Sequence, residues 1–433
     1  MTARQSIANY EPKVREYANF ALRGIKKICK ECGPRETGGE AEYKAQQMMA
    51  AELEGCCDSV ATEEFQVAPR AFMAWVKLGV ILGLLSVVSY NIGYAAVSAV
   101  LMVGLLAIIV LEFLLYKQAL DPFFPKKTSH NVIAVRRPKG EVKRRLIFCG
   151  HADSAPEWRF TYYGYKLFHS TALTVVVVAI SLVTMLYGTA ISIVSLALSH
   201  GLDGVGALSA RGPALNILGY VFAGLGVSLI VGWFFSNNNR FVEGANDNLS
   251  GCFTAMALPK MLQATGTQLE HTELMVLLSG GEEAGLRGAK AFCKAHAAEF
   301  CDVETVFVAL DTMTDFDFMG IYITDLTSTV KHDPAVCAML RKAAETAGHN
   351  VPYELLPFGA SDAAAATQAG LRAAAFAAMD PAPAPYYHTR LDVPDALQPK
   401  TLEACIDIVA EIAFQFDETG LAPFEGSTVK AGK

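Results

Sequence analysis

Long uncharged runs are the sequence feature that most restricts how this chain can fold. Residues 78–111, 167–202 and 212–239 contain no Asp, Glu, Lys or Arg. A helix needs ~20 apolar residues to cross the hydrocarbon core of a bilayer. The runs therefore predict about four membrane-spanning helices in two hairpins. We expect these spans near residues 72–90, 94–117, 168–190 and 214–236.

The third span is longer than one crossing needs. It could extend to residue 199, and we expect it to tilt or to break near Gly188. The alternative for all four runs is a set of buried core helices or an apolar dimerisation arm. Core helices rarely need such length, and a composition of 52% apolar and 18% charged residues is too apolar for an ordinary soluble enzyme. We therefore favour the membrane interpretation.

Charge and cysteine content exclude several classes of protein. The net charge of −7 and the lack of a basic cluster argue against a nucleic-acid partner. Ten cysteines without a repeating spacing do not indicate a disulfide framework, so we expect free thiols in a reducing compartment. The N-terminus is polar and has no apolar segment typical of a secretory signal.

Outside the uncharged runs, predicted strands alternate with predicted helices. The strands are expected at 60–67, 129–137, 145–150, 272–279, 304–310, 319–324 and 371–378. The helices are expected at 12–31, 40–55, 249–263, 286–298, 334–347 and 399–417. This alternation predicts a layered α/β sheet. In such sheets, ligands bind beyond the carboxyl ends of strands.

Acidic and imidazole side chains gather at those predicted strand ends. They are His151, Asp247, Glu282, Glu283, Asp311 and His388. Taken singly, each has a structural explanation: Asp247 is placed to cap the helix that follows, and the others are typical of polar loops.

Together, these side chains favour a metal centre, because zinc accepts both carboxylate and imidazole ligands. Two ions ~3.5–4 Å apart need a bridging carboxylate and about two further ligands each. The set supplies one bridge, two imidazoles and two more carboxylates, and leaves one glutamate free as a base. Asp153, two residues after His151, is placed to orient that imidazole.

Five motifs, in this order, resemble the M28 family of zinc aminopeptidases. They are G-H-A-D-S (150–154), G-A-N-D-N-L-S-G (244–251), S-G-G-E-E-A-G-L-R-G-A (279–289), A-L-D-T-M (309–313) and Y-Y-H-T-R-L-D (386–392). The G-P-R-E-T-G-G loop at 33–39 and the N-V-I-A-V strand look similar too. The likeness covers essentially all of the chain outside the two apolar blocks.

The resemblance implies a fold and a role for each site residue. The fold would be a three-layer αβα mixed sheet of the zinc-exopeptidase type, mostly eight-stranded. His151, Asp247 and Asp311 would hold one Zn²⁺, and Asp247, Glu283 and His388 the other. Glu282 would be the general base, and Tyr387 would hydrogen-bond the tetrahedral oxyanion.

The resemblance has one clear departure. After Gly359-Ala360-Ser361-Asp362, the family often has His, and Phe a few residues on, where this chain has Ala363 and Ala366. Because that stretch shapes the substrate side in the family, substrate preference stays open. The same stretch resembles a degraded serine-hydrolase elbow, which lacks its last glycine and any supporting triad order.

The hairpins divide the chain into five expected segments. The catalytic domain would comprise 1–71, 118–166 and 237–433, with transmembrane hairpins at 72–117 and 167–236. Each hairpin must cross an even number of times, because the ligands on either side must meet in one compartment.

Positive charges predict the orientation of the hairpins. Their catalytic-side ends carry Arg70, Lys77, Lys117, Lys126, Lys127, Arg159, Lys166 and Arg240, and the opposite tips only Arg211. Lys and Arg concentrate in cytoplasmic loops, so we expect an integral membrane protein whose catalytic domain faces the cytoplasm.

The expected function is a membrane-anchored dizinc aminopeptidase that acts on short peptides. The alternatives are a carboxypeptidase or N-acyl amino acid hydrolase on the same metal centre, and a non-catalytic membrane assembly protein that kept the fold. The oligomeric state stays open.

Overall fold

The computed structural model describes residues 2–198, 213–382 and 384–431 and divides into two compact units. The sheet unit comprises Met1–Pro69, Pro125–Pro156 and Arg240–Lys433. The helical unit comprises Arg70–Phe124 and Glu157–Asn239. The chain therefore passes between the units four times. Two short strands that pair with each other, β4 (Pro156–Trp158) and β5 (Ser236–Phe241), lie at two of these passages.

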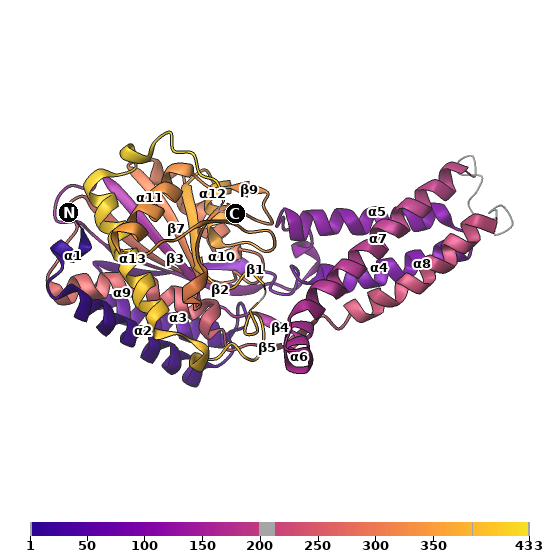
Figure 1. Ribbon diagram of the computed structural model, residues 1–433, viewed down its shortest axis with the longest axis horizontal. Coiled ribbons are helices and arrows are strands. Elements are labelled where there is room, and N and C mark those ends of the chain that lie inside the picture. The colour runs from indigo at the N-terminus through magenta and orange to yellow at the C-terminus, as the bar shows by residue number, and fades with distance from the viewer. Residues whose placement is uncertain (1, 199–212, 383, 432–433) are drawn as a thin grey trace. The chain divides into compact units, whose positions relative to one another are not determined.

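The sheet unit contains a nine-stranded mixed sheet (Figure 1). Its strands are β1 (Ser59–Val67), β2 (Lys127–Arg136), β3 (Arg144–His151), β6 (Thr272–Ser279), β7 (Glu304–Met313), β8 (Met319–Asp325), β9 (Val330–Lys331), β10 (Tyr353–Leu355) and β11 (Arg372–Ala378). They run in the order β1-β2-β6-β3-β7-β11-β8-β10, and β9 pairs with β8. The neighbours β6, β3, β7 and β11 are mutually parallel. Their carboxyl ends therefore lie along one edge of the sheet.

Helices cover both faces of this sheet. They are α1 (Ala3–Ser6), α2 (Tyr10–Cys32), α3 (Glu40–Glu54), α9 (Ser250–Thr265), α10 (Arg287–His296), α11 (Pro334–Thr346), α12 (Asp362–Gln368) and α13 (Pro399–Thr419). Side chains alternate along β3, so Leu146 and Phe148 pack into one core with α2, α9 and α13. Ile147 and Cys149 face a second core with α10 and α12. These two cores confirm the expected three-layer αβα fold.

Three features of the sheet unit differ from the sequence expectation. The strand expected to end at residue 310 continues through Asp311 to Met313, because β7 keeps pairing with β11 as far as Ala378. The short elements α1, α12, β9 and β10 were not expected, since runs of two to seven residues carry little periodicity. The sheet has nine strands rather than eight because β9 adds a short pairing beside β8.

The helical unit consists mainly of four long apolar helices (Figure 1). They are α4 (Ala74–Asn91), α5 (Ala95–Ile109) continued by the π-helical turn η1 (Val110–Leu114), α7 (Ala172–Leu198) and α8 (Pro213–Gly232). All four are long and apolar enough to cross a membrane. A shorter helix, α6 (Arg159–Phe168), precedes α7.

Of the two alternatives for the third span, a tilt or a break near Gly188, the structure shows no break: α7 runs through this residue without interruption to Leu198. Gly188 instead permits close packing: a Cβ there would lie 2.3 Å from the Phe222 ring. Residue 199, the far limit expected for this span, and Arg211 at the tip lie outside the described residues.

Buried hydroxyl groups link the helices of the helical unit. Ser98 Oγ lies 2.7 Å from both Ser86 Oγ and Ser192 Oγ, and Tyr90 Oη lies 2.8 Å from Ser195 Oγ. These bonds join α4 to α5 and both to α7. Interhelical hydroxyl bonds of this kind are typical of helices packed within a membrane.

Candidate metal centre

Five predicted ligands converge at the carboxyl edge of the sheet. His151 ends β3, Asp311 lies near the end of β7, and Glu283 follows β6. Asp247 lies in the turn before α9, and His388 lies in the loop after β11. Because β6, β3 and β7 are adjacent and parallel, their ends meet at one place.

Asp247 lies at the centre of the cluster. Its Oδ1 is 3.1 Å from His151 Nε2, and its Oδ2 is 3.1 Å from His388 Nε2. The ligand atoms of His151, Asp247 and Asp311 lie within 4.8 Å of one another, and so do those of Asp247, Glu283 and His388. The two sets share Asp247, with one carboxylate oxygen toward each histidine. Asp247 therefore does not act as the helix cap that its position alone suggests: Leu249 stands at the N-cap of α9, and both Asp247 carboxylate oxygens face histidine nitrogens.

The donor set fits divalent metal ions. Buried carboxylates outnumber basic groups here, and Glu283 Oε1 is buried without a hydrogen-bond donor. Burial and the charge of Asp247 together raise the pKa of Asp311 to about 7. Burial likewise raises the pKa of Glu283 well above its usual value, with Asp247 and Glu282 adding to the effect. Buried carboxylates in this number need cations to balance their negative charge. A mixture of carboxylate and imidazole ligands is typical of zinc sites.

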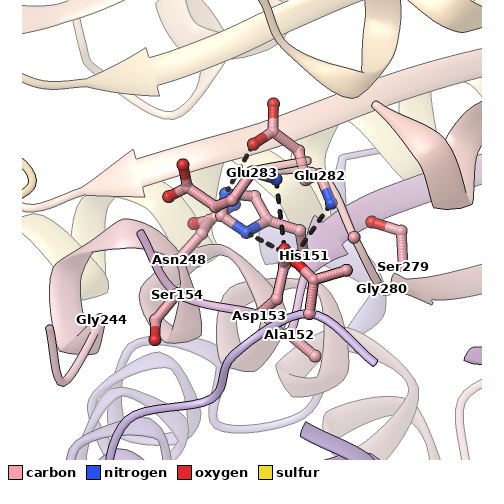
Figure 2. Close-up of polar contacts among 12 residues, drawn as sticks. His151, Ala152, Asp153, Ser154, Gly244, Asn248, Ser279, Gly280, Glu282 and Glu283 are labelled. Carbon is pink, nitrogen blue, oxygen red and sulfur yellow. Dashed lines mark hydrogen bonds and ion pairs between the residues drawn. The ribbon is translucent and has the colours of Figure 1, made fainter. Parts of the chain in front are cut away.

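Asp153 organises the surroundings of His151 (Figure 2). Its Oδ1 lies 3.5 Å from His151 Nδ1 and accepts a 3.0 Å hydrogen bond from the backbone N–H of Glu282. Its Oδ2 accepts from the backbone N–H of Glu283 at 3.2 Å and from the Thr37 hydroxyl at 2.6 Å. One buried carboxylate thus holds both a histidine and the turn that carries the paired glutamates.

A comparison with protein families finds a match for the part of the chain that carries most of this cluster. Residues 229–413 match the model of peptidase family M28. The matched segment includes Asp247, Glu283, Asp311 and His388, whereas His151 precedes it. No curated protein sequence matches the chain significantly.

Solved structures share the fold of this chain at low sequence identity. An aminopeptidase from Aneurinibacillus sp. strain AM-1 is 15% identical, with a TM-score of 0.55 over 94% of this chain and 95% of that one. A zinc aminopeptidase from Bacillus subtilis is 14% identical, with a TM-score of 0.53 over 92% and 94%. A glutaminyl cyclase from Fimbriiglobus ruber is 15% identical, with a TM-score of 0.52 over 92% and 95%. The chain thus has the fold of zinc exopeptidases, and the peptidase family match falls within this fold.

Arg35 joins two loops of the sheet unit that carry candidate ligands. Its buried guanidinium donates to the carbonyl oxygens of Ala152 at 2.6 Å, Glu243 at 2.5 Å, Gly244 at 2.9 Å and Gly33 at 3.2 Å. The carbonyl of Ala152 lies immediately after His151, and those of Glu243 and Gly244 lie shortly before Asp247. Sequence reasoning had named only the loop at 33–39 that contains this residue.

Asp392, at the end of the Y-Y-H-T-R-L-D motif, holds the turn that carries Asp247. Its Oδ1 accepts from the backbone N–H and side-chain amide of Asn246, both at 2.7 Å, and its Oδ2 accepts from the Asp247 N–H at 3.2 Å. The same motif carries His388, so one short segment provides a ligand and supports another. Asp392 was quoted within the motif but had no assigned role.

Glu282 and Tyr387 lie beside the cluster. Glu282 Oε2 is 3.9 Å from His151 Nε2. The Tyr387 ring stacks on the His388 ring with centroids 4.0 Å apart. Burial and nearby carboxylates, Asp247 first, raise the pKa of Tyr387 well above its usual value, so its hydroxyl stays protonated and able to donate. Asp311, Glu283 and Tyr387 are partly exposed, so water reaches the cluster from their side.

The two alanines that replace the family's His and Phe have structural roles in α12. Ala363 and Ala366 are fully buried in the second core. They therefore pack the sheet and do not line a substrate surface. Ser361 caps α12 and donates to Asp325 Oδ2 at 2.5 Å, which accounts for the elbow-like stretch without a nucleophile. Asp362 Oδ2 accepts from the Ser279 hydroxyl at 2.5 Å.

Proposed function

We propose that the chain is a membrane-anchored dizinc aminopeptidase that removes N-terminal residues from short peptides. The observation that carries the proposal is the sharing of Asp247 between two three-residue ligand sets. One zinc would be held by His151, Asp247 and Asp311, and the other by Asp247, Glu283 and His388. When bound, the two ions would provide a nucleophilic water at neutral pH and polarise the scissile carbonyl.

The remaining steps belong to side chains of this chain. Glu282 accepts a proton at its carboxylate and returns it to the departing amine. Tyr387 donates its hydroxyl to the oxyanion that develops on the attacked carbonyl. Asp153 keeps the His151 ring and the backbone of Glu282 in place. The partly exposed side of the cluster, rich in carboxylate, suits the free ammonium group of a peptide.

Substrate pairs test the proposal against its alternatives. An aminopeptidase should cleave a free-amine peptide and leave its N-acetylated form intact, whereas an N-acyl hydrolase or a carboxypeptidase should not need the free amine. A peptide that begins with glutamine should release glutamine; formation of a pyroglutamyl peptide instead would indicate a cyclase, the activity named for one of the similar structures. Glu282→Gln should abolish hydrolysis and retain zinc. An assembly protein without turnover would cleave none of these peptides.

We further propose that the four apolar helices cross a bilayer, with the sheet unit on the cytoplasmic side. Their lengths of 18, 20, 27 and 20 residues suit a membrane core, and the excess of Lys and Arg at their catalytic-side ends supports the orientation. Protease is added outside sealed vesicles whose cytoplasmic face points inward, and it should leave the sheet unit intact. Digestion of the sheet unit in these vesicles would show that it lies on the opposite side of the membrane.

A further inference from the structure

The helix α6 presents an exposed apolar and aromatic face. Thr161 and Gly164 on its other side are buried. Tyr163, Leu167 and Phe168 are 45%, 65% and 67% exposed. Tyr163 and Leu167 are one helical turn apart and therefore share a face. An aromatic and aliphatic face of this kind on a ten-residue helix needs a partner.

α6 is fixed at one end of the helical unit, which we call the base. The base is where α4 and α7 begin and α8 ends (Figure 1). The Arg159 N–H donates to Phe235 O at 2.9 Å, just after α8. Thr161 Oγ1 lies 2.8 Å from Thr174 Oγ1 in the first turn of α7. Hydrogen bonds therefore hold α6 against the ends of α7 and α8, two helices that are long enough to cross a membrane.

Aromatic and basic side chains also lie at the base. Trp233 and Phe234, just after α8, are 38% and 51% exposed. Lys77 Nζ, in the first turn of α4, lies 5.6 Å from the centroid of the Trp233 ring. Trp, Tyr and basic residues concentrate where a membrane meets water.

The charge at the base is arranged for an anionic partner. Lys117 and Lys166 are exposed, and Arg159 is half-buried. By contrast, Glu112 and Glu157 of the helical unit are fully buried. Each cation near an anionic leaflet strengthens binding by about fivefold. A zwitterionic or anionic headgroup layer satisfies the charges, and its acyl boundary accepts the apolar face.

We propose that α6 lies in the headgroup layer of the membrane, with Leu167 and Phe168 toward the acyl chains and Lys166 toward the lipid phosphates. The proposal rests on the membrane anchoring proposed above. It adds a lipid-binding surface at the base that prefers anionic phospholipid. A long Lys side chain next to apolar neighbours can direct its ammonium group to the phosphates while its stem stays on the apolar surface.

Depth-dependent fluorescence quenching tests the position of α6. Full-length Phe168→Trp would be reconstituted in vesicles of 70% phosphatidylcholine and 30% phosphatidylglycerol, with unsubstituted protein subtracted for its three native tryptophans. Lipids brominated near the headgroup should quench the added tryptophan at least twofold more than lipids brominated deep in the acyl chain. Val103→Trp, at an exposed site in the middle of the α5–η1 span, is the matched control and should show the reverse order.

Lipid preference is tested with Lys166→Glu in the Phe168→Trp background. Replacing phosphatidylglycerol by phosphatidylcholine, or introducing this charge reversal, should each reduce shallow quenching by about half. Quenching of the Phe168→Trp signal by aqueous iodide and not by brominated lipid would overturn the proposal, because it would place the side chain in water. Protection from both quenchers would also overturn it, because it would indicate contact with a protein partner. Release of the protein from vesicles by alkaline carbonate would instead refute the anchoring itself.

Discussion

Replacing Arg35 by lysine should loosen the metal centre without touching a ligand. The guanidinium donates four hydrogen bonds to buried carbonyl oxygens on three separate stretches of chain. A lysine keeps the charge but has one nitrogen, which cannot reach the carbonyls of Ala152 and Gly244 from the directions that Nε and Nη2 occupy.

The cost follows from the carbonyls left without donors. Two buried unsatisfied acceptors cost ~2–6 kcal/mol together. At ~2 °C per kcal/mol for a large domain, the melting temperature should fall by roughly 4–12 °C. Mutation of residues that hold metal ligands in place typically lowers metal affinity by about 10–100-fold. We expect a loss of this size in Arg35→Lys, because the loops after His151 and before Asp247 would no longer be held together.

Two assays would follow Arg35→Lys. Thermal unfolding of metal-free protein reports the stability change, and competition with a chromophoric chelator reports zinc affinity. Arg136→Lys is the matched control, since Arg136 also donates to backbone carbonyls, those of Cys56 at 2.6 Å and Thr267 at 3.3 Å, away from the cluster. It should lower stability and leave zinc affinity unchanged. Wild-type zinc affinity in Arg35→Lys, or an equal loss in Arg136→Lys, would refute the reasoning.

Two further substitutions test buried polar groups. Burial and the charge of Asp153 together raise the pKa of Glu42 to about 8. The folded state therefore keeps a proton that the unfolded state loses above ~4.5, and wild-type stability falls as the pH rises from ~4.5 to about 8. In metal-free protein, Glu42→Gln should gain up to ~5 kcal/mol relative to wild type between pH 5 and 9, and parallel pH curves for the two proteins would contradict this. Ser98→Ala removes the hydroxyl between Ser86 and Ser192 and should destabilise the helical unit by ~1 kcal/mol in detergent unfolding; an equal effect of the control Ser89→Ala would disprove a specific role.

Strong periodicity made most of the fold predictable from sequence. The strand expected at 272–279 matches β6 (Thr272–Ser279), and the strand expected at 371–378 matches β11 (Arg372–Ala378) despite its alanines. Both are continuous apolar runs between turn residues, which is typical of buried parallel strands. By contrast, α6 directly follows the short strand β4 and contains few aliphatic residues, so the sequence pattern does not indicate an amphipathic helix there.

The candidate ligands were easier to find in the sequence than the residues that hold them in place. His151, Asp247, Glu283, Asp311 and His388 have side chains whose chemistry points to metal. Arg35 and Asp392, however, act through backbone groups distant in sequence, and no local pattern shows which carbonyls an arginine will reach. Such contacts exist only once the sheet has brought β3 and the loop before α9 together.

Zinc content per chain tests the central claim most directly. Elemental analysis of purified protein dialysed against a slight excess of zinc should find close to two zinc ions per wild-type chain. Asp247→Asn, which alters the residue shared by both ligand sets, should retain fewer than one. A wild-type chain that binds one zinc or none, or an Asp247→Asn variant that still binds two, would contradict the account.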